Sequence, residues 1–356
     1  MNPNHTDAGR KISIAVNLLN MSFIIITLFL HVGTYISYYP EFMQKYSINL
    51  FLQKLSVGGF FFISGYKLTM SKSTDSLKKF VINRFFRVYL LYLLCLIFYS
   101  LSVYPDMNGG HIASYQNFIL HALCLQSILP NFFGNNYLTI WFVSVLFYCY
   151  FFFFLTRKIA EKTFLFFLIV LLNIFCIFLL HHIGKNNGID IFQSDLHIYL
   201  IFFALGMSYV HQQKKTDAFP YRYFLCLFCI AFIWLMMLYN MPFINTWYLS
   251  FSKFFFIIIS SIPLYFIIFK IAADVEFSGL MLRISAIISY SSFCIFLFHR
   301  VIWSVMAVAW YEKSLYQFLY IVILGSSVIF LFSYCMQKTY DNLMDYRKRS
   351  KSLLQT

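Results

Sequence analysis

The sequence predicts an all-α, polytopic membrane protein, and its composition and apolar runs carry that prediction. Of the 356 residues, 61% are hydrophobic and 11% are charged, and Phe, Trp and Tyr together make up 22%. A soluble domain averages about 25% charged and about 45–50% apolar residues. Ten apolar runs reach the length of about 20 residues that a helix needs to cross the hydrocarbon core. These features exclude a soluble enzyme, a disordered chain and a nucleic-acid-binding protein.

The ten runs extend along the whole chain, so we expect one integral domain over residues 1–356. They lie near 12–36, 48–70, 85–104, 138–156, 163–183, 194–211, 221–240, 247–269, 284–310 and 315–337. An eleventh run, 117–129, is too short to span and contains Asn117, His121 and Gln126. We expect it to form a short re-entrant or interfacial helix within an outer loop of residues 105–137.

The positions of the basic residues predict the orientation of the chain. The formal net charge is +14, from 27 Lys and Arg against 13 Asp and Glu. With ten spans and the N-terminus inside, all but six basic residues lie on the cytoplasmic side, as the positive-inside rule requires. The six others are Lys45, Lys54, Lys185, Lys253, Arg300 and Lys313. A crossing at 117–129 would reverse every later basic cluster, so we expect both termini to be cytoplasmic.

A histidine near the outer end of the first span is a candidate catalytic group. His31, in FIIITLFLHVGTY, lies about 19 residues into a helix that rises about 1.5 Å per residue. Ionisable side chains at membrane depth are costly and commonly functional. A neutral imidazole there is suited to act as a general base. The alternative is an interfacial histidine that bonds a backbone carbonyl.

Two arginines at the cytoplasmic end of the third span are candidate anion-binding residues. Arg84 and Arg87, in NRFFRVYLLY, are three residues apart and therefore share one helix face. The planar guanidinium fits phosphates and carboxylates. Anchoring in the membrane accounts for Lys78 and Lys79, but it needs only charge, so it explains the paired arginines less well.

A second ionisable pair, His299 and Arg300, lies inside the ninth span in SYSSFCIFLFHRV. An arginine at this depth needs a partner or water, unless its side chain extends to the outer interface. Asp and Glu are nearly absent from the spans, which disfavours a proton-coupled transporter based on membrane carboxylates. We see neither a metal-ligand cluster nor a Walker-type glycine loop, and so expect no metal site.

Five short motifs occur along the chain in the order found in a known family of membrane enzymes. They are the first-span His31, FFFISGY ending at Tyr66, the Arg84–Arg87 motif, IWFVSVLF with Trp141, and SYSSFCIFLFH ending at His299. In this order they resemble the acyltransferase-3 family, whose members O-acylate surface polysaccharides and related glycans.

The resemblance implies a multi-pass O-acetyltransferase of the plasma membrane (the bacterial inner membrane). Its donor would be cytoplasmic acyl-CoA, in the first place acetyl-CoA, with no bound cofactor. Its acceptor would be a hydroxyl of a surface polysaccharide or a lipid-linked precursor, and its other partner the lipid bilayer, with no nucleic acid. His31 would be the catalytic base, or form a transient acyl-histidine, and Arg84 and Arg87 would bind CoA. Supporting roles fall to Ser64, Tyr66, Trp141, His299 and Arg300.

The chain departs from the family pattern at three positions. Family members often have an Asp and an Arg upstream of the histidine, with the Arg eleven residues before it. Here Asn17 and Asn20 occupy those positions, and Leu90 stands where a Pro often follows the basic motif. The asparagines remove charge that could orient the donor or the substrate.

Three other functions are open on the sequence alone. A flippase or transporter of lipid-linked glycans explains ten aromatic spans equally well, but does not explain the arginine pair together with the SGY motif. A polysaccharide polymerase should have an arginine-rich outer loop, and residues 105–137 contain neither Lys nor Arg. A structural scaffold does not account for His and Arg at membrane depth.

Overall fold

The computed structural model describes residues 3–36, 46–71, 76–102, 114–130, 132–133, 137, 139–193, 195–217, 219–240, 247–310, 312 and 314–353. Within these ranges the regular structure is helical and no strand occurs. The sequence-based prediction of an all-α polytopic membrane protein is therefore confirmed. Residues 105–113, the first part of the predicted outer loop 105–137, lie outside the described residues.

The helices follow one another along the chain. Their bounds are α1 (Pro3–Val32), α2 (Tyr46–Met70), α3 (Leu77–Arg84), α4 (Leu90–Ser102), α5 (Tyr115–Ala122), α6 (Trp141–Thr156), α7 (Thr163–Asn186), α8 (Leu196–Asp217), α9 (Tyr221–Asn240), α10 (Trp247–Asp274), α11 (Gly279–Ala309), α12 (Leu315–Leu319) and α13 (Ser326–Leu353). Two π-helical segments, Phe85–Tyr89 and Tyr320–Gly325, join α3 to α4 and α12 to α13 without a break.

Eight helical stretches among the described residues are long and apolar enough to cross a membrane. The other two predicted spans correspond to α6 and α8. Helix α6 is apolar but has 16 residues, and at about 1.5 Å per residue it falls short of a hydrocarbon core about 30 Å thick. Helix α8 has the length, but it ends in the polar sequence HQQKKTD.

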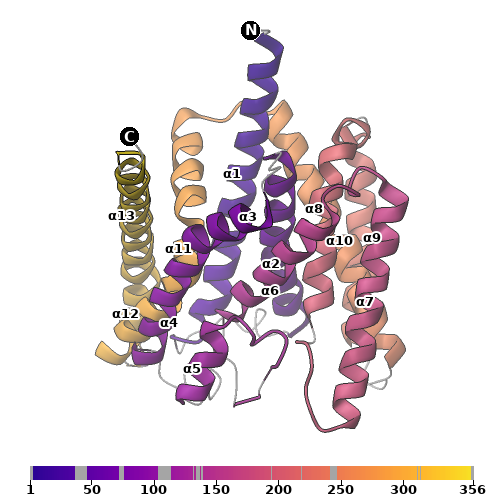
Figure 1. Ribbon diagram of the computed structural model, residues 1–356. Helices are drawn as coiled ribbons and strands as arrows, with labels where there is room; N and C mark the ends of the chain where they lie inside the picture. Colours follow the sequence, from indigo (N-terminus) through magenta and orange to yellow (C-terminus); the bar gives the residue numbers. More distant parts are fainter. Residues whose placement is uncertain are drawn as a thin grey trace.

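The start of α1 and the end of α13 lie toward the same end of the helical bundle (Figure 1). Both are in the upper part of the view, and α5 is at the bottom. Helix α5 has eight residues and begins at the Ser114 N-cap, so the region of the predicted loop helix is helical but too short to cross. We refer below to the terminal end and the α5 end of the bundle.

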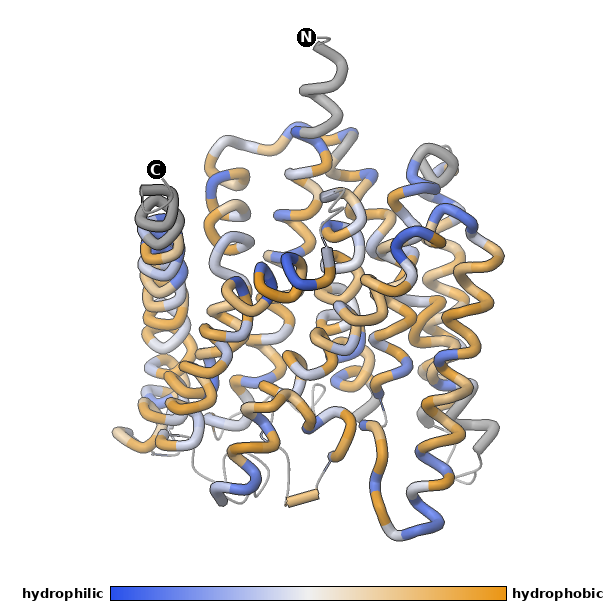
Figure 2. The backbone as a smooth tube through the Cα atoms, viewed as in Figure 1, coloured by the Kyte–Doolittle hydropathy of each residue, from blue (hydrophilic) through white to orange (hydrophobic). Residues whose placement is uncertain are grey.

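The outermost helices present apolar side chains to their surroundings. Helix α7 has the highest mean hydropathy of the candidate spans, 2.9. Only 17% of its most apolar stretch of 18 residues is buried inside the protein. Figure 2 shows hydrophobic residues along most of α7, with hydrophilic residues near its lower end. A helix that exposes so much apolar surface is suited to contact with lipid.

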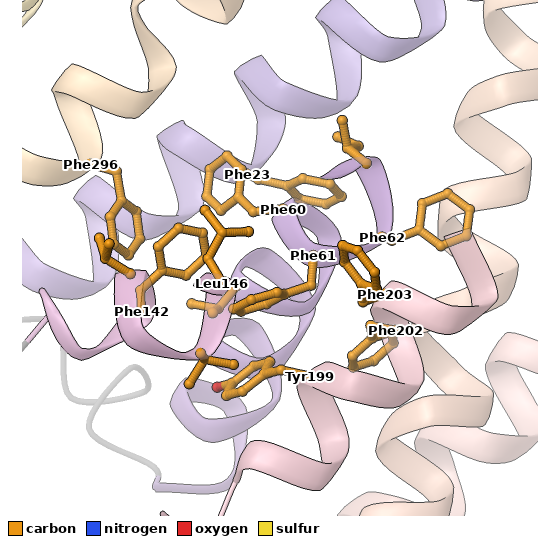
Figure 3. Close-up of a cluster of buried hydrophobic side chains, with 14 of the residues drawn as sticks. Phe23, Phe60, Phe61, Phe62, Phe142, Leu146, Tyr199, Phe202, Phe203 and Phe296 are labelled. Carbon is orange, nitrogen blue, oxygen red and sulfur yellow. The ribbon is translucent and has the colours of Figure 1, made fainter. Parts of the chain in front are cut away.

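Packed aromatic rings form a large part of the core (Figure 3). Phe61 and Phe62 of α2 and Phe202 of α8 are fully buried. Two glycines bring the backbones of these helices together: a Cβ on Gly65 would collide with the Phe203 carbonyl, and one on Gly206 with the Phe62 carbonyl. Small residues at helix crossings permit this approach in membrane proteins. The closely packed α2 and α8 form a rigid support for the site described next.

Candidate active site

The two histidines predicted from separate spans are in direct contact. His31 lies in the last turn of α1 and His299 in the second half of α11, and their Nδ1 and Nε2 atoms are 2.7 Å apart. The ring planes differ by 6° and the centroids are 5.0 Å apart. The centroid separation equals the N···N distance plus the distance from each ring centre to its own nitrogen. Both nitrogens therefore lie on the line between the centroids. The imidazoles therefore meet edge to edge in a common plane.

The backbone around His299 determines which nitrogens carry protons. His299 Nδ1 is 3.1 Å from the Ile295 carbonyl oxygen and 2.9 Å from that of Phe296. Carbonyls only accept, so this Nδ1 carries the proton and Nε2 of the neutral ring is an acceptor. His31 Nδ1 must then donate to His299 Nε2. The lone pair of His31 is left on Nε2, where a general base needs it.

A cavity with a cationic lining opens between α1, α2, α3, α11 and α13. It consists of two adjoining spaces that share Lys67, Arg84, Arg87, Ser289, Tyr290 and Gln337 as lining residues. None of the three cations forms an ion pair with a described carboxylate. Asp341, the one carboxylate among the described lining residues, accepts from Tyr290 and Gln337. The cavity thus has an excess of positive charge and suits an anionic ligand.

Helix geometry directs the two arginines into the same space. The Ser76 side chain caps α3 by accepting from the Lys79 amide, and Arg84 ends the helix. The π-helical turn Phe85–Tyr89 follows and contains Arg87. Such turns occur often at functional sites. The Arg84 guanidinium lies 5.4 Å from the ring centroids of Phe80 and Tyr150, which position it.

Three aromatic rings line the cavity where it approaches the histidines. Phe60, Phe142 and Phe296 are mutually packed, with centroid separations of 6.2, 5.7 and 4.6 Å, and Figure 3 shows them side by side. The Phe296 ring also contacts the His299 ring at 6.1 Å. One aromatic layer therefore separates the cationic cavity from the histidine pair.

The cations and the histidines lie toward opposite ends of the bundle. Helix α1 runs from the terminal end to the α5 end, and His31 is in its last turn. Helix α2 returns, and Lys67 is in its last turn. Arg84 and Arg87 follow shortly after Lys67. The predicted separation of the arginines from the histidine is present in the structure.

The two asparagines that replace the charged residues of the family pattern line this same cavity. Asn20 is buried, donates to the Ser289 hydroxyl at 2.9 Å and lines the space that contains Ser64. Asn17 lines the adjoining space that contains Asp341. Charged residues at these positions would project into the cavity. In this chain the positive charge comes from the α2 and α3 side instead, from Lys67, Arg84 and Arg87.

Of the other residues predicted to support the site, Ser64, Tyr66 and Trp141 lie in three different places. Ser64 lines the cavity. Tyr66 does not line it: its ring is buried against Tyr209, and its hydroxyl donates to Gln213 at 3.1 Å. Trp141, the first residue of α6, packs on Tyr199 beside the partly buried ion pair of Lys54 and Asp195.

Arg300 is 6% exposed, and its guanidinium lies near Tyr35, His31 and His299. Its head group is inside the protein and does not extend to an interface. No group of three or more His, Cys, Asp or Glu side chains placed to hold a metal ion occurs among the described residues.

Comparison with known proteins identifies the family of this chain. A family model described as "Acyltransferase domain" matches residues 15–338, nearly the whole chain. The chain belongs to the acyltransferase-3 family. The resemblance inferred from the five motifs is thus confirmed, and the protein is a multi-pass membrane acyltransferase. No curated protein and no solved structure matches it.

Lys67 was not predicted to bind the donor, although it lines the cavity together with Arg84 and Arg87. A signal for it was present in the sequence, because Lys67 directly follows the SGY motif near the end of the same apolar run.

Proposed function

We propose that this acyltransferase moves an acetyl group from cytoplasmic acetyl-CoA to a hydroxyl of a cell-surface polysaccharide or its lipid-linked precursor, in the plasma membrane. The observation that carries the proposal is the cationic cavity, which reaches an aromatic layer in contact with the His31–His299 pair. It provides an anion site on one side and a base on the other.

The donor part of the proposal rests on charge and position. CoA carries phosphates at one end and the thioester at the end of a long flexible arm. Lys67, Arg84 and Arg87 bind the phosphates through charge-assisted hydrogen bonds at the terminal end, which we take to be cytoplasmic by the positive-inside rule. The arm extends past Ser64 and Asn20 toward the aromatic layer. Displacement of these rings brings the thioester to His31.

The chemical step uses the free lone pair of His31. Its Nε2 takes the proton of the acceptor hydroxyl as that oxygen attacks the thioester carbonyl. The C–S bond breaks, and the thiolate of CoA receives the proton back from His31. The products are the acetyl ester and CoA. His299 acts as a positioning residue, because its Nε2 accepts from His31 Nδ1 and holds the tautomer.

Thermal stability of the detergent-purified protein distinguishes this proposal from a flippase or transporter. A ligand at about 100 times its Kd stabilises the protein by about 2.7 kcal/mol. We expect CoA and acetyl-CoA to raise Tm, and Arg84→Gln/Arg87→Gln to abolish the rise. The matched control is Lys78→Gln, on the exposed side of α3. Stabilisation by lipid-linked glycan but not by CoA would contradict the donor assignment and favour transport.

A further inference from the structure

The guanidinium of Arg300 is a buried cation with no carboxylate partner among the residues that the structure describes. The residue is 6% exposed, and neither Nε nor Nη1 has a hydrogen-bond partner in that part of the chain. No described carboxylate forms an ion pair with it. A buried charge in this state is costly unless something compensates it. Arg300 is also nine residues before the end of α11, so its burial is not that of a side chain at a helix end.

The groups near Arg300 are polar, and none of the described ones carries a negative charge. The guanidinium lies near the Tyr35 hydroxyl and close enough to Tyr99 of α4 to act on it electrostatically. It also acts on both imidazoles, those of His31 and His299. Arg300 therefore lies at the same place as the proposed base, and on the histidine side of the aromatic layer.

Acyl transfer supplies a negative charge at this place only during the reaction. When the hydroxyl attacks, the electrons of the C=O bond move onto the carbonyl oxygen, and His31 becomes a cation. Between two cations an oxyanion is strongly favoured, whereas the resting thioester carbonyl is neutral. A cation that meets its counter-charge only in the transition state stabilises that state selectively.

We propose that Arg300 is a catalytic residue that binds the donor's carbonyl oxygen and stabilises the oxyanion. The inference rests on the proposed acyl transfer at His31, and it holds for any thioester donor. The free Nε and Nη1 protons bind the oxygen as it becomes negative. When the C–S bond breaks, the carbonyl re-forms and the guanidinium returns to its uncompensated state.

The main alternative is that Arg300 binds an anionic group of the acceptor. The two roles differ for thioester hydrolysis, in which water replaces the acceptor but the same oxyanion forms. Loss of an oxyanion ligand slows hydrolysis and transfer by the same factor. Loss of an acceptor ligand raises the acceptor KM and leaves hydrolysis unchanged.

The test uses the full chain in lipid nanodiscs, with acetyl-CoA and the host's glycan fraction. Arg300→Met should lower kcat for transfer and for hydrolysis alike, by about 10²–10³-fold. CoA-induced thermal stabilisation should be unchanged. Arg300→Lys, which keeps the charge, should retain more of both activities, and Arg283→Met, exposed on the same helix, is the control.

Three results would overturn the inference. One is a kcat within threefold of wild type in Arg300→Met. Another is an effect on transfer but not on hydrolysis. If the Met variant does not fold, the same comparison in Arg300→Lys decides, and unequal loss of the two activities counts against the proposal. Absence of acetyl transfer in the wild type would instead refute the proposed function.

Discussion

His31 and His299 lie in one plane, with Nδ1 of the first 2.7 Å from Nε2 of the second. The contact joins α1 to α11 across 268 positions of the sequence. Because the carbonyls of Ile295 and Phe296 hold the His299 proton on Nδ1, the direction of the histidine–histidine bond is determined. This relationship converts His31 from a polar residue at the end of a helix into a base with a defined free nitrogen.

Replacement of His31 by Ala should abolish acyl transfer and leave donor binding intact. A positioned general base contributes about 10²–10⁴-fold to the rate, and the aromatic layer keeps the donor's phosphates away from His31. The measurements are acetyl transfer in nanodiscs and the rise in Tm with CoA. His182→Ala, an exposed histidine on α7, is the matched control. Transfer at the wild-type rate by His31→Ala would show that another group is the base.

The role of His299 is tested by replacements that differ in hydrogen bonding. His299→Phe removes the acceptor for His31 Nδ1, so kcat should fall by about 10–100-fold, the scale found when partners that orient metal-bound histidines are removed. The donor KM should be unchanged. His299→Gln offers an amide oxygen in place of Nε2 and should recover part of the rate. Equal losses in the two variants would point to packing alone.

The cationic lining should control donor affinity. Arg84→Gln or Arg87→Gln removes a charge-assisted contact of about 1.5–3 kcal/mol, so each should raise the donor KM by about tenfold or more. Lys67→Gln should have a similar effect, and raised salt should weaken binding in the wild type. Titration with CoA measures the donor affinity of the three variants and its salt dependence in the wild type. Lys78→Gln is the control. Equal CoA affinity in every variant is the result that would rule out this cavity as the donor site.

Close packing between α2 and α8 should make two glycines intolerant of substitution. Gly65→Ala and Gly206→Ala each place a methyl group against a backbone carbonyl, and overpacking costs about 1–3 kcal/mol. Tm in detergent should therefore fall. Gly279→Ala is the matched control, because a Cβ there meets no atom within 4 Å. An unchanged Tm in the first two variants would mean that the helices separate easily.

Composition and periodicity predicted the all-α class and the order of the helices, because membrane crossing requires long apolar runs. They did not predict the π-helical turn at Phe85–Tyr89, since a π-helical turn differs from an α-helical one by a single extra residue. The length of α6 was also overestimated. Its apolar character begins before Trp141, but the preceding residues Thr139 and Ile140 form a turn.

For the site, the sequence identified the chemistry and the structure identified the contacts. His31 and His299 were each chosen for their depth, but no local pattern links two residues that are far apart in the chain. Tyr66 and Ser64 belong to the same motif, but their side chains lie on different faces of α2. Ser64 lines the cavity, and the Tyr66 hydroxyl bonds Gln213. Arg300 was expected to need a partner, water or the outer interface, but it is buried and forms no ion pair with a carboxylate in the described ranges.

The most direct test of the central claim is the O-acetyl content of the host's surface glycans, measured by NMR in a strain that lacks this gene. The strain is complemented with the wild type, His31→Ala or His182→Ala. We predict that O-acetyl signals disappear on deletion, return with the wild type and His182→Ala, and stay absent with His31→Ala. Unchanged O-acetylation in the deletion strain, or its full recovery with His31→Ala, would contradict the account.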